Sequence, residues 1–171
     1  MNQSTDVLAI KKDKTKALVQ FAVLTGLAMA APFLRSQAIT GPIVNATLLI
    51  TTAMLGLRYG LGISLLPSVF AYFLGLLPQM MLPMIPFIIT GNAILVIVFY
   101  LFKEKSYWLA VLCGAFLKFL FLFFSSSAVA SLIIKQPVAS KISQMMSWPQ
   151  FFTALAGGVI AYLFLRFLKR A

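Results

Sequence analysis

The chain has 171 residues, of which 61% are hydrophobic and only 10% carry a charge. An ordinary soluble domain carries about 25% charged residues, so this chain has too few polar groups to cover a core of such composition. A soluble globular domain is therefore excluded. An integral membrane protein remains, with room for about six spans of about 20 residues each.

The sequence lacks the residues that several kinds of catalytic and metal-binding sites require. The chain has no histidine, which excludes histidine-based catalysis and histidine-ligated metals. Its single cysteine, Cys113, can form no internal disulfide. The three acids are Asp6, Asp13 and Glu104, and all lie outside the apolar runs, whereas ion-coupled carriers usually need a carboxylate within the membrane. We expect no metal site, no cofactor and no ion coupling in this chain.

Nearly unbroken apolar runs of this length are typical of membrane helices and not of barrel strands. The sequence predicts an all-α, compact bundle of six transmembrane helices, in one domain over residues 17–171. Residues 1–16 are polar, and we expect them to form a disordered or surface-lying cytoplasmic tail. The six predicted spans are Ala17–Leu34, Ile43–Leu57, Leu61–Leu77, Met84–Phe102, Tyr107–Phe124 and Phe151–Leu168.

The net charge of +11 is distributed very unevenly between the two ends of such a bundle. An even number of spans places both termini on one side, and cytoplasmic loops carry an excess of lysine and arginine. The charge therefore predicts cytoplasmic termini and some affinity for anionic lipids, and it gives no reason to expect nucleic-acid binding. The inner side holds Lys11, Lys12, Lys14, Lys16, Arg58, Lys103, Lys105, Arg166, Lys169 and Arg170, and the outer side holds Arg35, Lys135 and Lys141.

The sequence also predicts the conformation of the segments that connect the spans. We expect Arg35–Gly41 to be an outer loop, with Pro42 opening a second helix of about 15 residues that is short for a full crossing. Pro78–Pro86 reads as an outer turn. The fifth helix ends at Phe124 or continues to Ile134, and Gln136–Pro149 is the longest outer connection.

Lys118 is the only charged residue well inside a predicted span. A lysine near the bilayer centre costs about 3 kcal/mol on insertion scales. One interpretation is that its long side chain extends outward to the membrane interface. The other is that it faces a polar cavity, where it would meet a bound anion or a substrate carbonyl.

Polar amides gather in the outer half of the bundle, around the level of Lys118. Inside a membrane protein an amide must find partners, so it either bridges helices or contacts a ligand. Trp148 is either a ligand-stacking residue or a member of the interfacial aromatic belt. The candidate substrate-binding residues are Lys118, Asn92, Asn45, Gln150, Gln79 and Trp148.

The first helix carries small residues at intervals of four, at Ala22, Gly26 and Ala30. Small residues at this spacing let another helix backbone approach closely, which favours helix association in lipid. This face either packs within the bundle or docks a separate membrane partner.

Taken together, these features resemble the substrate-binding S components of energy-coupling factor (ECF) transporters. The resemblance covers nearly the whole chain. It rests on the basic tail before Ala22-x-x-x-Gly26-x-x-x-Ala30, on six spans in about 170 residues, and on short motifs. Those motifs are Gly41-Pro-Ile-Val-Asn45-Ala46, Pro83-Met-Ile-Pro86, Gly91-Asn92-Ala93 and Phe151-Phe-Thr-Ala-Leu-Ala-Gly157-Gly158.

The resemblance implies a non-enzymatic capture protein in the bacterial plasma membrane. It would bind a vitamin or related micronutrient, such as a pyridoxine- or thiamine-precursor-like molecule. It would work with a membrane coupling subunit, which Ala22, Gly26 and Ala30 would dock, and with two cytoplasmic ATPases. The sequence contains no GxxxxGK[ST] phosphate-binding loop, so the ATP chemistry would belong to those partners.

Two other functions are compatible with parts of the sequence. An intramembrane enzyme would need a nucleophile and a base. The sequence offers one such combination, a hydroxyl of Ser125, Ser126 or Ser127 as the nucleophile with Lys118 as the base. A stand-alone facilitator or assembly factor needs no special residues. Co-purification with ATPase subunits would separate it from an S component.

Overall fold

The computed structural model describes residues 3–133 and 138–168, and within these ranges the chain is helical apart from short turns. Three of the basic residues assigned to a side of the membrane, Lys135, Lys169 and Arg170, lie outside the described residues. The elements are α1 (Gln3–Ala30), η1 (Ala31–Leu34), α2 (Gln37–Leu55), α3 (Leu57–Phe73), η2 (Gln79–Met84), α4 (Ile85–Phe102), α5 (Tyr107–Ile133), α6 (Val138–Met145) and α7 (Trp148–Phe167).

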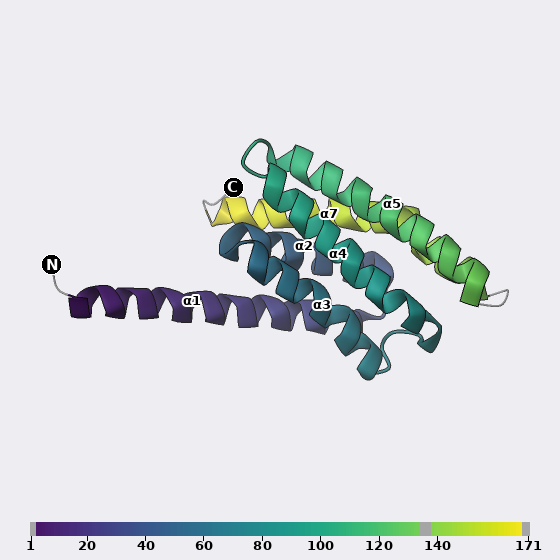
Figure 1. The fold of residues 1–171 in the computed structure, drawn as a ribbon, viewed down its shortest axis with the longest axis horizontal. Coiled ribbons are helices and arrows are strands. Elements are labelled where there is room, and N and C mark those ends of the chain that lie inside the picture. Colours follow the sequence, from purple (N-terminus) through teal and green to yellow (C-terminus); the bar gives the residue numbers. More distant parts are fainter. Residues whose placement is uncertain (1–2, 134–137, 169–171) are drawn as a thin grey trace.

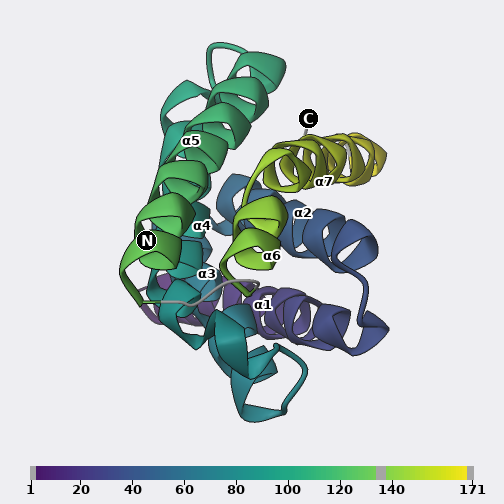
Figure 2. The same ribbon diagram turned by 90° about the vertical axis from the view of Figure 1, so that its right-hand side faces the viewer.

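The six long helices form two layers, with α1, α2 and α7 in one and α3, α4 and α5 in the other (Figure 2). The short helix α6 lies between the layers at one end of the bundle. The end of α7 lies at the opposite end, beside the α4–α5 turn, and the start of α1 projects beyond the bundle on that same side (Figure 1). The predicted all-α fold is confirmed for the described residues.

Five helices of the described part are long and apolar enough to cross a membrane. The sixth long helix, α3, has 17 residues and is therefore about 26 Å long, slightly less than the roughly 30 Å hydrocarbon core of a bilayer. The prediction had assigned this shortness to the second helix. In the structure α2 has 19 residues instead, and it is α3 that is short.

The expectation of disorder is not met over residues 3–16, because α1 begins at Gln3 and continues without a break to Ala30. The physical reason is local composition. No glycine or proline occurs before Gly26, and lysine, alanine and leucine are good helix formers. The polarity of this segment was therefore a poor guide to its backbone conformation.

The predicted outer loop Arg35–Gly41 is wrong, because α2 begins at Gln37. Pro42 lies inside α2 and does not open it. A proline this close to the helix start removes a single backbone hydrogen bond, which membrane helices tolerate. The reversal is made by Arg35 alone, in the left-handed conformation with φ of 50°. Thr40 strengthens it by donating a hydrogen bond to the Ala31 carbonyl at 3.0 Å.

The later connections are more ordered than the sequence indicates. The predicted turn before α4 contains η2, and α5 continues past Phe124 to Ile133, which resolves the alternative left open. The longest predicted connection contains α6, whose methionine and isoleucine side chains pack on α5 and η2. This segment therefore covers the end of the bundle as a helix.

Two adjacent glycines let α7 approach its neighbours closely. A Cβ atom at Gly157 would lie 2.6 Å from Asn45 Cβ and 2.8 Å from the backbone nitrogen of Ala46 on α2. A Cβ atom at Gly158 would collide with Val111 on α5. The last helix is therefore held against both layers, and its contact with α2 positions Asn45.

Candidate functional site

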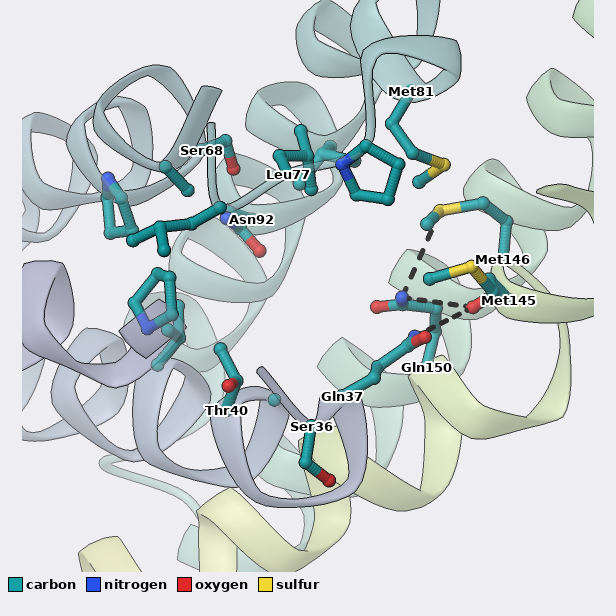
Figure 3. A pocket seen from close by; sticks show the side chains of 18 of the residues that line it. Ser36, Gln37, Thr40, Ser68, Leu77, Met81, Asn92, Met145, Met146 and Gln150 are labelled. Atoms are coloured by element: carbon teal, nitrogen blue, oxygen red, sulfur yellow. Dashed lines mark hydrogen bonds between the residues drawn. The ribbon is translucent and has the colours of Figure 1, made fainter. Parts of the chain in front are cut away.

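A cavity of about 450 Å³ opens at the α6 end of the bundle. Its walls come from the start of α2, the end of α3, the start of α4, the middle of α5 and the α6–α7 corner (Figure 3). The volume lies in the range of sites that bind small molecules. Its polar lining includes Arg35, Ser36, Gln37, Thr40, Asn45, Ser68, Asn92, Lys118 and Gln150.

The inner end of the cavity is formed by Lys118 and two asparagines. The Lys118 ammonium donates hydrogen bonds to Asn45 Oδ1 at 2.6 Å and to Asn92 Oδ1 at 2.7 Å. All three residues are buried, with 2 to 3% exposure. Lys118 therefore does not extend to the membrane interface, and the cavity interpretation describes its position. We call these three residues the inner cluster.

Each member of the inner cluster comes from a different helix. Asn45 lies on α2, where α7 packs against it through Gly157. Asn92 lies on α4 and also donates a long hydrogen bond of 3.4 Å to the Ser64 carbonyl of α3. Lys118 projects from α5. Four of the six long helices thus meet at one set of polar contacts, which fixes their relative positions in an apolar interior.

The outer end of the cavity is formed by Gln37 and Gln150, which both reach the α6–α7 corner. Gln37 Nε2 donates to the Met145 carbonyl at 2.9 Å, and Gln150 Nε2 donates to the same carbonyl at 3.2 Å (Figure 3). Gln150 is one of the predicted residues. Gln37 is not among the predicted residues; it lies in the stretch Arg35–Gly41, which the sequence predicts as an outer loop and which the structure shows to contain the start of α2.

The cavity lining is basic. Lys118 and Arg35 both line it, and no aspartate or glutamate is among the described residues that do. Arg35 is exposed and lies at the mouth, whereas Lys118 is buried at the inner end. A buried cation without a carboxylate partner leaves room for an anionic group of a ligand.

The structure does not bring two of the predicted residues to this cavity. Gln79 is exposed on η2 and is not among the lining residues. Trp148 is 58% exposed and stacks on Phe119, with ring centroids 4.8 Å apart and an interplanar angle of 23°. Its ring lies on the outside of the bundle, where an interfacial tryptophan belongs.

The small-residue face of α1 is not packed within the bundle. Ala22, Gly26 and Ala30 are all exposed, and a Cβ atom at Gly26 would have nothing within 4 Å. The opposite face of α1 packs on the core through Leu24 and Ala28. The interpretation as internal packing is therefore wrong, and docking of a partner stays a prediction.

Two of the three serine hydroxyls considered for an enzyme donate hydrogen bonds within their own helix. Ser126 and Ser127 both donate hydrogen bonds to the Phe123 carbonyl, at 3.0 Å and 2.9 Å. Lys118 donates to the two asparagines and not to a serine. The described residues therefore contain no Ser–Lys pair arranged for proton transfer.

Comparisons with known proteins place the chain in a family. No curated protein and no solved structure matches it. The family model described as "ECF transporter, substrate-specific component" matches residues 16–166. This match begins within α1, covers α2 to α5 in full, ends within the last turn of α7, and includes both ends of the cavity. The chain therefore belongs to the family of substrate-specific components of ECF transporters.

Proposed function

We propose that this multi-pass membrane protein captures a vitamin or related micronutrient in the cavity between the inner cluster and the α6–α7 corner. Components of this family are transport-binding subunits and not enzymes. The observation that carries the proposal is a buried lysine, held by two asparagines at the inner end of a cavity of about 450 Å³. An expensive buried charge of this kind marks a substrate site in membrane proteins.

In this proposal the cavity faces the outside of a bacterial plasma membrane, and both chain ends face the cytoplasm. The charge distribution supports the orientation. The end that holds the start of α1 and the end of α7 also carries Arg58, Lys103, Lys105 and Arg166. The cavity end carries Arg35 and, on α6, Lys141. An excess of basic residues on one side favours the cytoplasm for that side.

The proposed partners are a membrane coupling subunit and two cytoplasmic ATPases, which would reorient the loaded protein and supply the energy. The exposed small residues Ala22, Gly26 and Ala30 support a docking role for α1. Their face is apolar and uncovered, and small residues allow the close helix approach by which membrane helices associate. All six long helices would span the bilayer, with α3 as the shortest.

A direct experiment tests this function. The protein is co-expressed with candidate coupling and ATPase subunits, purified gently, and heated to release bound small molecules for mass spectrometry. We expect a stoichiometric small molecule, co-purification of the partners, and uptake of that molecule that stops when ATP hydrolysis is blocked. A protein that releases no small molecule and recruits no ATPase would contradict the proposal and favour an assembly factor.

A further inference from the structure

The two ends of the cavity present opposite hydrogen-bonding groups. We propose that the ligand is an elongated, apolar-centred molecule with an anionic acceptor group, a carboxylate or phosphate, at its inner end and hydrogen-bond donors at its outer end. This inference rests on the proposed function and adds the chemical class and the direction of the bound molecule. It follows from how four amide side chains are oriented.

At the inner end the amide orientations are dictated by Lys118. A lysine amine that donates N–H groups can be met only by the oxygen of an amide, so Oδ1 of Asn45 and of Asn92 must face Nζ. Both amide groups therefore turn their nitrogens away from the lysine. The Asn45 nitrogen has no hydrogen-bond acceptor among the residues that the structure describes.

What remains available at the inner end is a set of donors. Lys118 has one N–H left after its two hydrogen bonds, and the Asn45 amide nitrogen has two. Asn92 uses one N–H for the Ser64 carbonyl. Each amide oxygen already accepts one hydrogen bond from the lysine and keeps one lone pair, so free N–H groups outnumber free acceptor positions at this end. An acceptor with two or three oxygens matches this set, and the positive charge favours an anion.

At the outer end the orientations are reversed. Only an N–H group can donate to the Met145 carbonyl, so Nε2 of Gln37 and of Gln150 must both face it. Gln150 Nε2 also lies 3.9 Å from Met146 Sδ. The two Oε1 atoms accept no hydrogen bond within the described part of the chain, and Figure 3 shows the Gln150 oxygen directed into the cavity. Free acceptors of this kind match a hydroxyl, amino or ring N–H group.

The two ends face each other across an apolar middle. In Figure 3 Asn92 lies across the cavity from Gln37 and Gln150. The cavity lining also includes the apolar side chains of Pro67, Leu77 and Ile88. A ligand with a ring or chain in its centre would therefore bury apolar surface between two polar ends. The exposed Arg35 at the mouth would attract such an anion before it enters.

The test uses three ring compounds that differ at one end only. They are para-(hydroxymethyl)benzoate, which has both features, para-(hydroxymethyl)benzamide, which lacks the anion, and para-methylbenzoate, which lacks the donor. Binding to the purified full-length protein, emptied of bound small molecules, is measured by calorimetric titration at millimolar concentrations. We expect the first compound to bind about tenfold or more tightly than the benzamide, and about threefold to tenfold more tightly than the methyl compound.

Two variants test the inner end and the outer end of the cavity separately. Asn45→Asp keeps the oxygen that Lys118 needs but replaces the free donors with a second oxygen, so we expect the carboxylate preference over the benzamide to disappear. Gln150→Leu should remove the preference for the hydroxymethyl over the methyl compound and leave the carboxylate preference intact. Gln144→Glu is the matched charge control, because Gln144 is exposed on α6 and does not line the cavity.

Several results would overturn the inference. Equal or tighter binding of the benzamide, an unchanged carboxylate preference in Asn45→Asp, or no binding by any of the three compounds would each do so. Loss of the carboxylate preference in Gln144→Glu as well would also do so, because the effect would then be one of bulk charge. The proposed function fails separately, when the wild type releases no small molecule and supports no uptake. A released molecule without an anionic group would refute the inference alone.

Discussion

Asn45 Oδ1 lies 2.6 Å from Lys118 Nζ, although 73 residues separate the two in the chain. This contact joins α2 to α5 in an interior where no carboxylate balances the lysine. The two side chains should therefore depend on each other energetically, and this dependence can be measured without any ligand.

A double-mutant cycle tests that dependence. Lys118→Met leaves two buried oxygens without a donor, and Asn45→Ala removes one of the two acceptors of the lysine. We expect the two effects on the free energy of unfolding in detergent to be non-additive by about 0.5–3 kcal/mol. The control pair is Lys118→Met with Thr90→Ala, because the exposed Thr90 bonds only the Pro86 carbonyl of its own helix. Additivity in the first cycle would contradict the contact.

Lys118→Met should also weaken ligand binding more than any other single change at the site. A hydrogen bond to a charged group is worth about 1.5–3 kcal/mol, so affinity for the small molecule that co-purifies with the wild type should fall about 10- to 150-fold. Membrane insertion should not suffer, because about 3 kcal/mol of insertion penalty is removed.

Asn92→Leu and Gln150→Leu serve as the comparison for Lys118→Met. Each removes a neutral hydrogen-bonding group from the cavity lining, so each should give a smaller loss of affinity. The measurement is a titration of the same small molecule against all three purified variants. Wild-type affinity in Lys118→Met would show that the lysine does not meet the ligand.

Gly157→Ala should disturb the ligand cavity indirectly, because Gly157 of α7 packs against Asn45. Its Cβ atom would lie 2.6 Å from Asn45 Cβ and 2.9 Å from the Pro42 carbonyl oxygen, and the backbone atoms of α2 cannot move aside as a side chain can. We expect a loss of about 1–3 kcal/mol in stability together with weaker ligand binding. Thermal unfolding and titration of the purified variant measure both.

The matched control for Gly157→Ala is Gly26→Ala, where the added methyl group meets nothing within 4 Å. Helix propensity alone should make this variant as stable as the wild type or up to about 1 kcal/mol more stable. Equal effects of the two substitutions on thermal unfolding would refute the close approach of α7 to α2.

Bulky substitutions on the exposed face of α1 should separate binding from transport. Ala22→Trp and Ala30→Leu place large side chains where a partner helix would approach closely, so uptake and co-purification of the coupling subunit should be lost. Ligand binding by the isolated protein should survive, because both residues are exposed on the surface of α1.

Val159→Trp is the size-matched control for the α1 variants, since Val159 is an exposed apolar residue of α7. It should insert, bind and transport as the wild type does. If Val159→Trp abolishes uptake to the same extent, or if the α1 variants lose ligand binding as well, the docking role of α1 is wrong.

The sequence predicted the parts of this structure that depend on composition. Apolar runs located the long helices, and the single charge inside one of them identified Lys118 as a candidate functional residue. Three amides of the cavity lining followed from the same logic, because polar groups are expensive in lipid. Such predictions succeed because the cost of burying a polar group does not depend on knowing the fold.

The parts that failed depend on tertiary contacts. The sequence predicts a helix start at Pro42, yet α2 begins at Gln37. Gln37, one of the two glutamines at the outer end of the cavity, was therefore not predicted. Gln79 and Trp148 have the right chemistry and lie near the cavity end in sequence, but their side chains face outward. The direction of a side chain on a helix surface is set by neighbouring helices, which a sequence pattern alone does not specify.

The packing of α7 on α2 also has a consequence for how the protein is made. Asn45 emerges early in synthesis, yet the helix that packs behind it contains Gly157 and emerges after the five other long helices. The first five long helices are therefore made before the cavity is complete. A ribosome-bound chain that stops before Trp148 lacks Gln150 and the wall behind Asn45. Under the proposed function, a chain in which α7 has not yet been inserted therefore lacks a complete binding cavity.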